Sequence, residues 1–199
     1  MWKATIVTEP IEEPINEREA KEQCRVETGD TEEDEFIKTL ITTARMYVEQ
    51  VTGRALLKQT WDMYLDEWPE GDTLQVPKPP LIWTVASSSI KYTNSSDVEA
   101  TLAITEYDVD TDSDPGQIVL KYGKSWPSAT LRPMNPINLR FDCGYVEPPN
   151  VPSGLKHAIR LLVADMFEMR ETKVIGASVA VLDTIDMLLY PHRVWNWRV

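Results

Sequence analysis

Hydrophobic side chains recur at helical spacing in the N-terminal and C-terminal parts of this 199-residue chain. From Ile37 to Val51 they follow the i, i+3, i+4, i+7 rule of an amphipathic helix, and from Leu155 to Phe167 they form a wider apolar stripe. A last helix is expected over roughly residues 179–189, ending before Pro191, because proline does not continue a helix.

Capping signals mark the ends of two predicted helices. Asn16 is suited to begin a short helix, and Glu19, three residues later, completes a capping box. Asp30 or Thr31 is expected to cap the second helix, and Gly53 is suited to end it in the left-handed conformation.

The hydrophobic period changes to two between about residues 57 and 145. Every second side chain is apolar in residues 61–65 and 137–143, which predicts half-buried strands. Shorter strand-like runs are separated by turn signals such as Asp114-Pro115-Gly116. These runs are Leu74–Val76, Leu81–Val85, Ile90–Tyr92, Tyr107–Val109 and Ile118–Leu120.

Together these patterns predict an α+β fold. A small bundle of about four helices receives a β-rich antiparallel insertion between its second and third helices. The expected parts are an extended arm (residues 1–14) with the first helices (1–56), the insertion (57–147), the C-terminal helices (148–190) and a C-terminal docking tail (191–199).

Charge and composition exclude some classes of function. Residues 1–35 hold twelve acidic and four basic side chains, and the whole chain carries −12. Proteins that grip phosphate have the opposite sign, so sequence-specific DNA binding is not expected, whereas an acidic wall along which DNA passes remains compatible. No apolar run reaches the length of a membrane span, and Met1-Trp2-Lys3-Ala4 lacks a signal core, so no secretion signal is expected.

Candidate catalytic and metal-binding groups are sparse. Cys24, Cys143, His157 and His192 fit no zinc spacing, and two free thiols are expected. His157 is expected to be a packed or capping residue and His192 to make polar contacts with a partner. No phosphate-binding glycine loop and no nucleophile elbow occur, so neither a cofactor nor an enzymatic activity is predicted.

Two features leave alternatives open. Residues Asp108–Asp114 have acids at alternate positions, which suits either a solvated turn or a weak cation site, although Ser113 stands where a calcium loop has glycine. Four tryptophans of the insertion suit sheet packing or, alternatively, a carbohydrate- or peptide-binding face; they are Trp61, Trp68, Trp83 and Trp126.

The C-terminal tail combines aromatic and basic residues in an otherwise acidic chain. Trp195 and Trp197 alternate with polar residues, Arg193 and Arg198 are basic, and no acid occurs after Pro191. Tryptophan and arginine dominate many interfaces. The tail is therefore expected either to dock into another protein or to fold back on its own subunit.

Taken in order, many short segments resemble the adaptor (head-tail connector) proteins of long-tailed phages and prophages. Their order and spacing carry the resemblance, which covers nearly the whole chain. The segments include Glu13-Pro14-Ile15, Asp30–Glu35, Tyr47-Val48-Glu49, Thr52-Gly53-Arg54-Ala55-Leu56, Gln59-Thr60-Trp61, Pro79-Pro80-Leu81, Ser89-Ile90-Lys91-Tyr92, Tyr107-Asp108-Val109-Asp110, Cys143-Gly144-Tyr145, Lys156-His157-Ala158-Ile159 and Leu188-Leu189-Tyr190-Pro191-His192-Arg193. The polar stretch Val85-Ala86-Ser87-Ser88 and the extension past Arg193 depart from the family pattern.

The resemblance implies a structural subunit of the virion neck that assembles in the host cytoplasm. Such subunits form a ring, commonly of twelve, beneath the portal protein, and the ring receives a stopper or tail protein on its other side while genomic DNA passes through. It also implies that the C-terminal segment binds the portal. The residues concerned are Tyr190, Pro191, His192, Arg193, Val194, Trp195, Trp197 and Arg198.

A metal-dependent hydrolase that uses Asp108–Asp114 is a further alternative.

Overall fold

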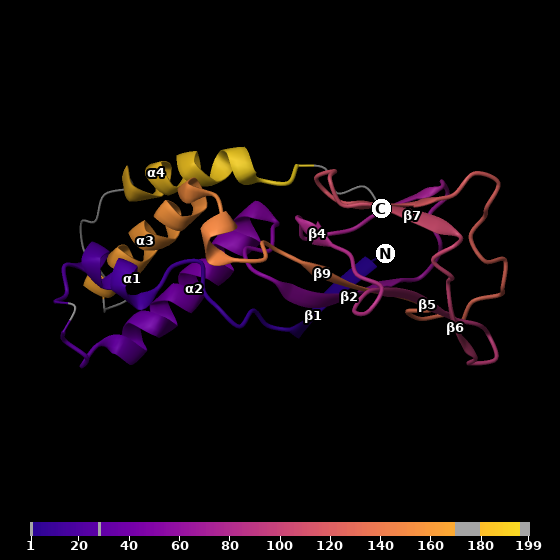
Figure 1. The fold of residues 1–199 in the computed structure, drawn as a ribbon, viewed down its shortest axis with the longest axis horizontal. Coiled ribbons are helices and arrows are strands. Elements are labelled where there is room, and N and C mark those ends of the chain that lie inside the picture. Colours follow the sequence, from indigo (N-terminus) through magenta and orange to yellow (C-terminus); the bar gives the residue numbers. More distant parts are fainter. Residues whose placement is uncertain (1, 28, 170–179, 196–199) are drawn as a thin grey trace. The chain divides into compact units, whose positions relative to one another are not determined.

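The computed structural model describes residues 2–27, 29–169 and 180–195. In this part the chain forms two compact units. The sheet unit contains the described residues of 1–10, 58–144 and 194–195, and the helical unit contains those of 11–57 and 145–193. Figure 1 shows the elements of both units along the chain. Four helices and antiparallel sheets confirm the predicted α+β class.

The helical unit brings together helices from both ends of the sequence. The α-helices are α1 (Glu17–Cys24), α2 (Asp34–Thr52), α3 (Ser153–Glu168) and α4 (Ala180–Leu189), with 3-10 turns η1 (Pro148–Asn150) and η2 (Tyr190–His192). Helix α3 contacts α1, α2 and α4. None of the helices in the described ranges is long and apolar enough to cross a bilayer.

The start of α1 is the predicted capping box. The Asn16 side chain accepts a hydrogen bond from the Glu19 backbone N–H at 2.9 Å, and the Glu19 carboxylate accepts one from the Asn16 N–H at 2.9 Å. At the end of α2, Gly53 has φ 73°, and its N–H bonds to the Glu49 carbonyl at 3.0 Å, as predicted. Local hydrogen bonding therefore decides where α1 begins and where α2 ends.

The predicted cap of α2 at Asp30 or Thr31 is wrong. The helix begins at Asp34, after a turn in which the Asp30 carboxylate accepts from the Glu32 N–H at 3.0 Å. The buried Lys21 ammonium binds the Asp30 carbonyl at 2.6 Å and forms an ion pair with Asp34. This long-range cation holds residues 30–33 in a turn, and the local pattern gave no sign of it.

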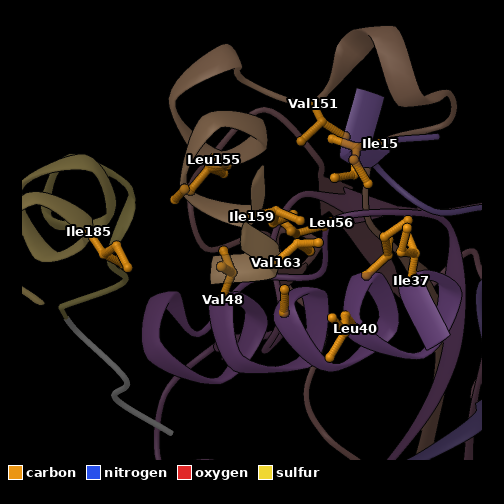
Figure 2. Close-up of a cluster of buried hydrophobic side chains, with 14 of the residues drawn as sticks. Ile15, Ile37, Leu40, Val48, Leu56, Val151, Leu155, Ile159, Val163 and Ile185 are labelled. Atoms are coloured by element: carbon orange, nitrogen blue, oxygen red, sulfur yellow. The ribbon is translucent and has the colours of Figure 1, made fainter. Parts of the chain in front are cut away.

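The core of the helical unit contains most of the two predicted apolar stripes, of which Val51, Leu162, Met166 and Phe167 are only partly buried, together with residues from outside the stripes. Figure 2 shows these side chains converging from α2, α3, α4 and the segments before α1 and α3. Residues with 0–2% exposure include Ile15, Ile37, Val48, Leu56, Val151, Leu155, Ile159, Val163 and Ile185. Burial of so many aliphatic side chains supplies most of the stability of such a bundle.

The sheet unit contains a six-stranded and a three-stranded sheet, and every strand pairing is antiparallel. The first sheet has the order β1-β2-β9-β5-β6 with β4 beside β9, and the second the order β3-β8-β7. The strands are β1 (Trp2–Thr8), β2 (Gln59–Leu65), β3 (Thr73–Gln75), β4 (Leu81–Ile82), β5 (Ser89–Thr93), β6 (Glu99–Thr101), β7 (Tyr107–Asp110), β8 (Gln117–Leu120) and β9 (Ile137–Cys143). Strands β2 to β9 lie between α2 and α3, which confirms the predicted insertion.

Two strands have no counterpart among the predicted runs. The N-terminal arm contains β1, which pairs with β2 from Trp2↔Leu65 to Thr8↔Thr60. The short strand β6 is polar and pairs with β5. Both are edge strands. In β1 the apolar Trp2, Ala4 and Ile6 alternate with Lys3 and Thr5, a strand signal that the prediction missed, whereas β6 has only three residues, which are too few to show a period. The strand expected over Leu81–Val85 is shorter, because residues 84–88 form a turn in which the Ser87 and Ser88 N–H groups bond to Thr84.

The two faces of the large sheet separate apolar from polar residues. Met63, Leu139 and Phe141 are fully buried on one face. On the other face Arg140 forms two hydrogen bonds of 2.7 Å with Asp62. The predicted period of two therefore separates an apolar from a polar face of the sheet, and Asp62 and Asp142 on the polar face are buried as well.

Candidate functional site

Helix α4 and the turn after it position the described part of the C-terminal segment. Ile185 and Leu189 are buried in the helical core, so the other side of α4 faces outward. Pro191 occupies a first-turn position of η2, where its fixed φ and missing N–H are tolerated. The chain then becomes extended at Arg193 (φ −68°, ψ 137°).

Residues 192 and 193 are held by polar contacts within the helical unit. Arg54 donates a 2.5 Å hydrogen bond to the His192 carbonyl, and Arg193 pairs with Asp186 at 3.1 Å. Burial, and secondarily the nearby Arg54 charge, lowers the pKa of His192, so its ring is neutral near pH 7. The predicted partner-contact residue His192 thus has a local anchoring role.

Along the chain, three apolar residues before, in and after this turn are exposed. Tyr190 is 60% exposed and Trp195 is 62% exposed. Met187, on the outward side of α4, is 76% exposed. The sequence prediction missed Met187; its signal was a large apolar residue outside the stripe of Ile185 and Leu189. Trp197 and Arg198, also predicted for this site, lie outside the described residues.

The arrangement suits recognition of another polypeptide. Aromatic, methionine and arginine side chains are enriched at interface cores, and a preformed turn reduces the entropy cost of binding. Among the described residues, no three His, Cys, Asp or Glu side chains gather in a way that could hold a metal ion.

The two cysteines and His157 are the side chains outside this segment that the sequence offers as reactive groups. Cys24 and Cys143 are free, buried thiols, and burial together with nearby Glu168 raises the pKa of Cys24. A raised pKa keeps this thiol protonated and unreactive. His157 is exposed on α3, so the expected packed or capping role is wrong.

The acidic run at the end of β7 forms a tight turn. The Asp110 carboxylate accepts hydrogen bonds from the Asp112 N–H at 2.9 Å, the Ser113 N–H at 3.1 Å and the Ser113 hydroxyl. These donors, the Ser113 hydroxyl first, lower the pKa of Asp110. The carboxylate is thus used in stabilising the turn.

The four tryptophans of the insertion pack against neighbours. Trp68 and Trp126 stack with ring centroids 4.9 Å apart, and Trp83 meets Tyr107 edge-on at 5.9 Å. The Trp61 indole N–H donates to the Gln59 side chain at 3.0 Å. All four are partly buried, which is the arrangement of sheet packing rather than of a row of exposed rings.

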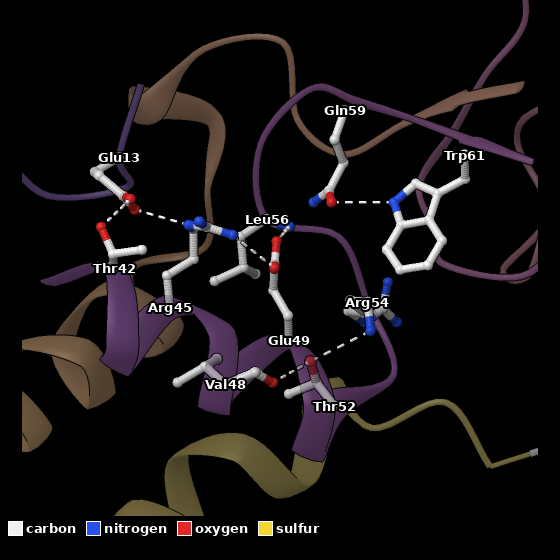
Figure 3. Close-up of polar contacts among 10 residues, drawn as sticks. All are labelled: Glu13, Thr42, Arg45, Val48, Glu49, Thr52, Arg54, Leu56, Gln59 and Trp61. Carbon is white, nitrogen blue, oxygen red and sulfur yellow. Dashed lines mark hydrogen bonds and ion pairs between the residues drawn. The ribbon is translucent and has the colours of Figure 1, made fainter. Parts of the chain in front are cut away.

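A buried charged cluster in the helical unit is structural as well. Arg45 lies between Glu13 at 2.8 Å and Glu49 at 2.9 Å, as Figure 3 shows. Thr42 donates to the other Glu13 oxygen at 2.8 Å, and the Leu56 N–H donates to the other Glu49 oxygen at 2.8 Å. Each carboxylate is satisfied on both oxygens, so the cluster fastens the residues before α1 and after α2.

Comparison with known proteins gives a match at the level of structure. No protein-family model matches the chain, and no curated protein matches its sequence. A chain in the neck of an empty GTA particle, computed with C6 symmetry, superposes with a TM-score of 0.80 at 20% identity. A chain of the virion of a native gene transfer agent (GTA) particle gives 0.77 at 19%, and one in the neck of a native GTA particle computed with C12 symmetry gives 0.73 at 17%.

These similarities extend over whole chains. Each covers 98% of this chain and 97% of the other. At such identities they show the fold: this chain shares it with chains of gene transfer agent particles, two of them from the neck. The fold implied by the resemblance to phage adaptors is thereby confirmed.

Proposed function

We propose that this protein is a structural, non-enzymatic adaptor subunit of the neck of a tailed-phage particle. Twelve copies form a ring beneath the portal protein, join the head to a stopper or tail protein, and let genomic DNA pass through the ring. The subunit belongs to the virion and assembles in the host cytoplasm.

One observation carries the proposal, namely the full-length likeness to a neck chain with a TM-score of 0.80. Because both chains are covered almost completely, the likeness includes the bundle and the insertion together and not one common motif. The similar neck chains come from assemblies computed with sixfold and twelvefold symmetry, which supports a ring.

The negative charge of the chain is consistent with DNA that passes through the ring without binding to it. A net charge of −12 repels phosphate, so DNA in the ring would slide along the wall and not adhere. We assign no base-reading or phosphate-binding residue to the protein.

The C-terminal segment is proposed to bind the portal. Its exposed contact residues are Met187, Tyr190, Pro191 and Trp195, followed in sequence by Trp197 and Arg198. His192 and Arg193 orient the segment through their contacts with Arg54 and Asp186.

The test is incorporation of full-length and truncated protein into necks on portal-bearing heads. Removal of residues 194–199 should leave a chain with the circular dichroism of the folded protein and abolish incorporation. Trp195→Ala alone should weaken binding by at least about tenfold, because tryptophans that become buried at an interface are common binding hot spots.

Val85→Ala is the matched control, since Val85 is 76% exposed and lies in the insertion. It should incorporate normally. Normal incorporation of the truncated protein would show that the tail is not the portal contact.

A further inference from the structure

The helical unit contains a preformed groove with an apolar floor and an acidic rim. Its volume is 540 Å³, and its lining includes Pro14, Ile15, Ile41 and Pro148. Cavities of about 150 Å³ hold a benzene ring, so this groove has room for an aromatic side chain and adjoining backbone. Ile11, directly before the groove residues in the chain, is 97% exposed.

Carboxylates outnumber cations at this groove. Glu12, Glu13, Glu17 and Glu19 line it together with the single cation Lys38. Glu13 is tied to Arg45, Glu19 to Arg160, and Lys38 is shared by Glu17 and Glu35. The groove therefore favours an occupant that combines an apolar side chain with positive charge.

The sheet unit presents such an occupant. Residues 115–141 contain four basic and no acidic side chains, in a chain of net charge −12. After β8, the turn Lys121–Lys124 closes with a 2.9 Å hydrogen bond from the Lys124 N–H to the Lys121 carbonyl. The two lysines of the turn each have one acidic neighbour: Lys121 pairs with Asp108 at 3.5 Å and Lys124 with Glu106 at 3.1 Å. Tyr122 lies in this turn and is fully exposed, at 105%.

The turn is fixed before any partner arrives. Gly123 adopts φ 76°, a left-handed conformation that glycine tolerates best. The Lys121 N–H bonds to the Glu106 carbonyl at 3.0 Å, and the Lys124 ammonium pairs with Glu106 at 3.1 Å. A rigid turn that presents tyrosine between two lysines loses little entropy on docking.

We propose that Tyr122 and its turn dock into the Glu12 groove of a second copy of this chain. The two surfaces differ, so the contact is head-to-tail, and a repeated head-to-tail contact gives a ring when the rotation between copies closes and an open filament when it does not. The inference rests on the proposed function in that it names a contact of the proposed ring.

The experiment measures association of the full chain by analytical ultracentrifugation up to about 1 mM. The turn variant is Tyr122→Ala with Lys124→Glu, and the groove variant is Glu12→Lys with Glu17→Lys. Each alone should self-associate at least about tenfold more weakly than the natural chain. Mixed one to one, they should form dimers that do not grow, because each variant keeps the surface that the other lacks.

Val98→Ala and Glu32→Lys are the controls, because they remove an exposed apolar side chain and reverse an exposed acid outside the two surfaces. Both should associate like the natural chain. A natural chain that stays monomeric at about 1 mM, or variants that associate normally, would overturn the contact. Ultracentrifugation tests the contact between copies, and incorporation into necks tests the proposed adaptor function. The proposed contact can therefore fail while the proposed function holds, and the reverse.

Discussion

Arg45 illustrates how one buried charge stabilises two connections of the helical unit. Its side chain is 4% exposed, against 28% for Glu13 and 12% for Glu49. An ion pair in such surroundings has lost much hydration, and removal of one partner leaves the others buried and unpaired. Arg45 therefore matters for stability mainly because its removal would leave the Glu13 and Glu49 carboxylates without their cation.

Arg45→Met is expected to lower the free energy of unfolding by about 3–5 kcal/mol. The physical reason is the uncompensated charge of Glu49 and Glu13. Urea denaturation followed by circular dichroism measures the change.

Lys38→Met provides the comparison, because Lys38 also pairs with two glutamates but is 47% exposed. Exposed pairs contribute about 0–1 kcal/mol, so this variant should be nearly neutral. Equal losses for Lys38 and Arg45 would show that burial is not the deciding factor.

At the scale of elements, helix α1 depends on its local ends more than the longer helices do. It has only eight residues, and short helices are marginal without capping or packing. Its capping box and the ion pair between Glu19 and Arg160 of α3 provide both kinds of support.

Asn16→Ala should therefore destabilise the fold by about 1 kcal/mol, because the Glu19 N–H loses its acceptor. Hydrogen exchange of the α1 amides should rise first. Asn150→Ala, at an exposed asparagine of η1, should change neither quantity. A variant Asn16→Ala with unchanged α1 exchange would contradict a stabilising cap.

At the scale of the whole molecule, the two units have separate apolar cores. Leu155 lies in the core of the helical unit, and Leu139 is fully buried in the sheet unit. Replacement of a buried leucine by alanine costs about 2–5 kcal/mol.

Leu155→Ala should accelerate amide exchange in α1 to α4 and leave β2 and β9 protected, whereas Leu139→Ala should do the reverse. Hydrogen exchange read by mass spectrometry distinguishes the units. Equal acceleration in both units by either variant would show that they unfold as one.

The sequence by itself determined the elements whose signals are local. Apolar spacing placed α2 and α3, Asn16 and Glu19 placed the start of α1, and alternation placed β2 and β9, because each depends on residues within a few positions. It also predicts an interaction segment around Tyr190 and Trp195, because tryptophan, tyrosine and arginine are enriched at interfaces, and this stays a prediction.

Only the tertiary structure decided features that depend on distant partners. The start of α2 follows from Lys21, the strand β1 from its pairing with β2, and the anchoring of His192 from Arg54. The proposed roles of the Tyr122 turn and the Glu12 groove likewise rest on the exposure of Tyr122 and the volume of the groove. Hydrophobic spacing does not encode either quantity, because both arise when separate segments of the chain pack.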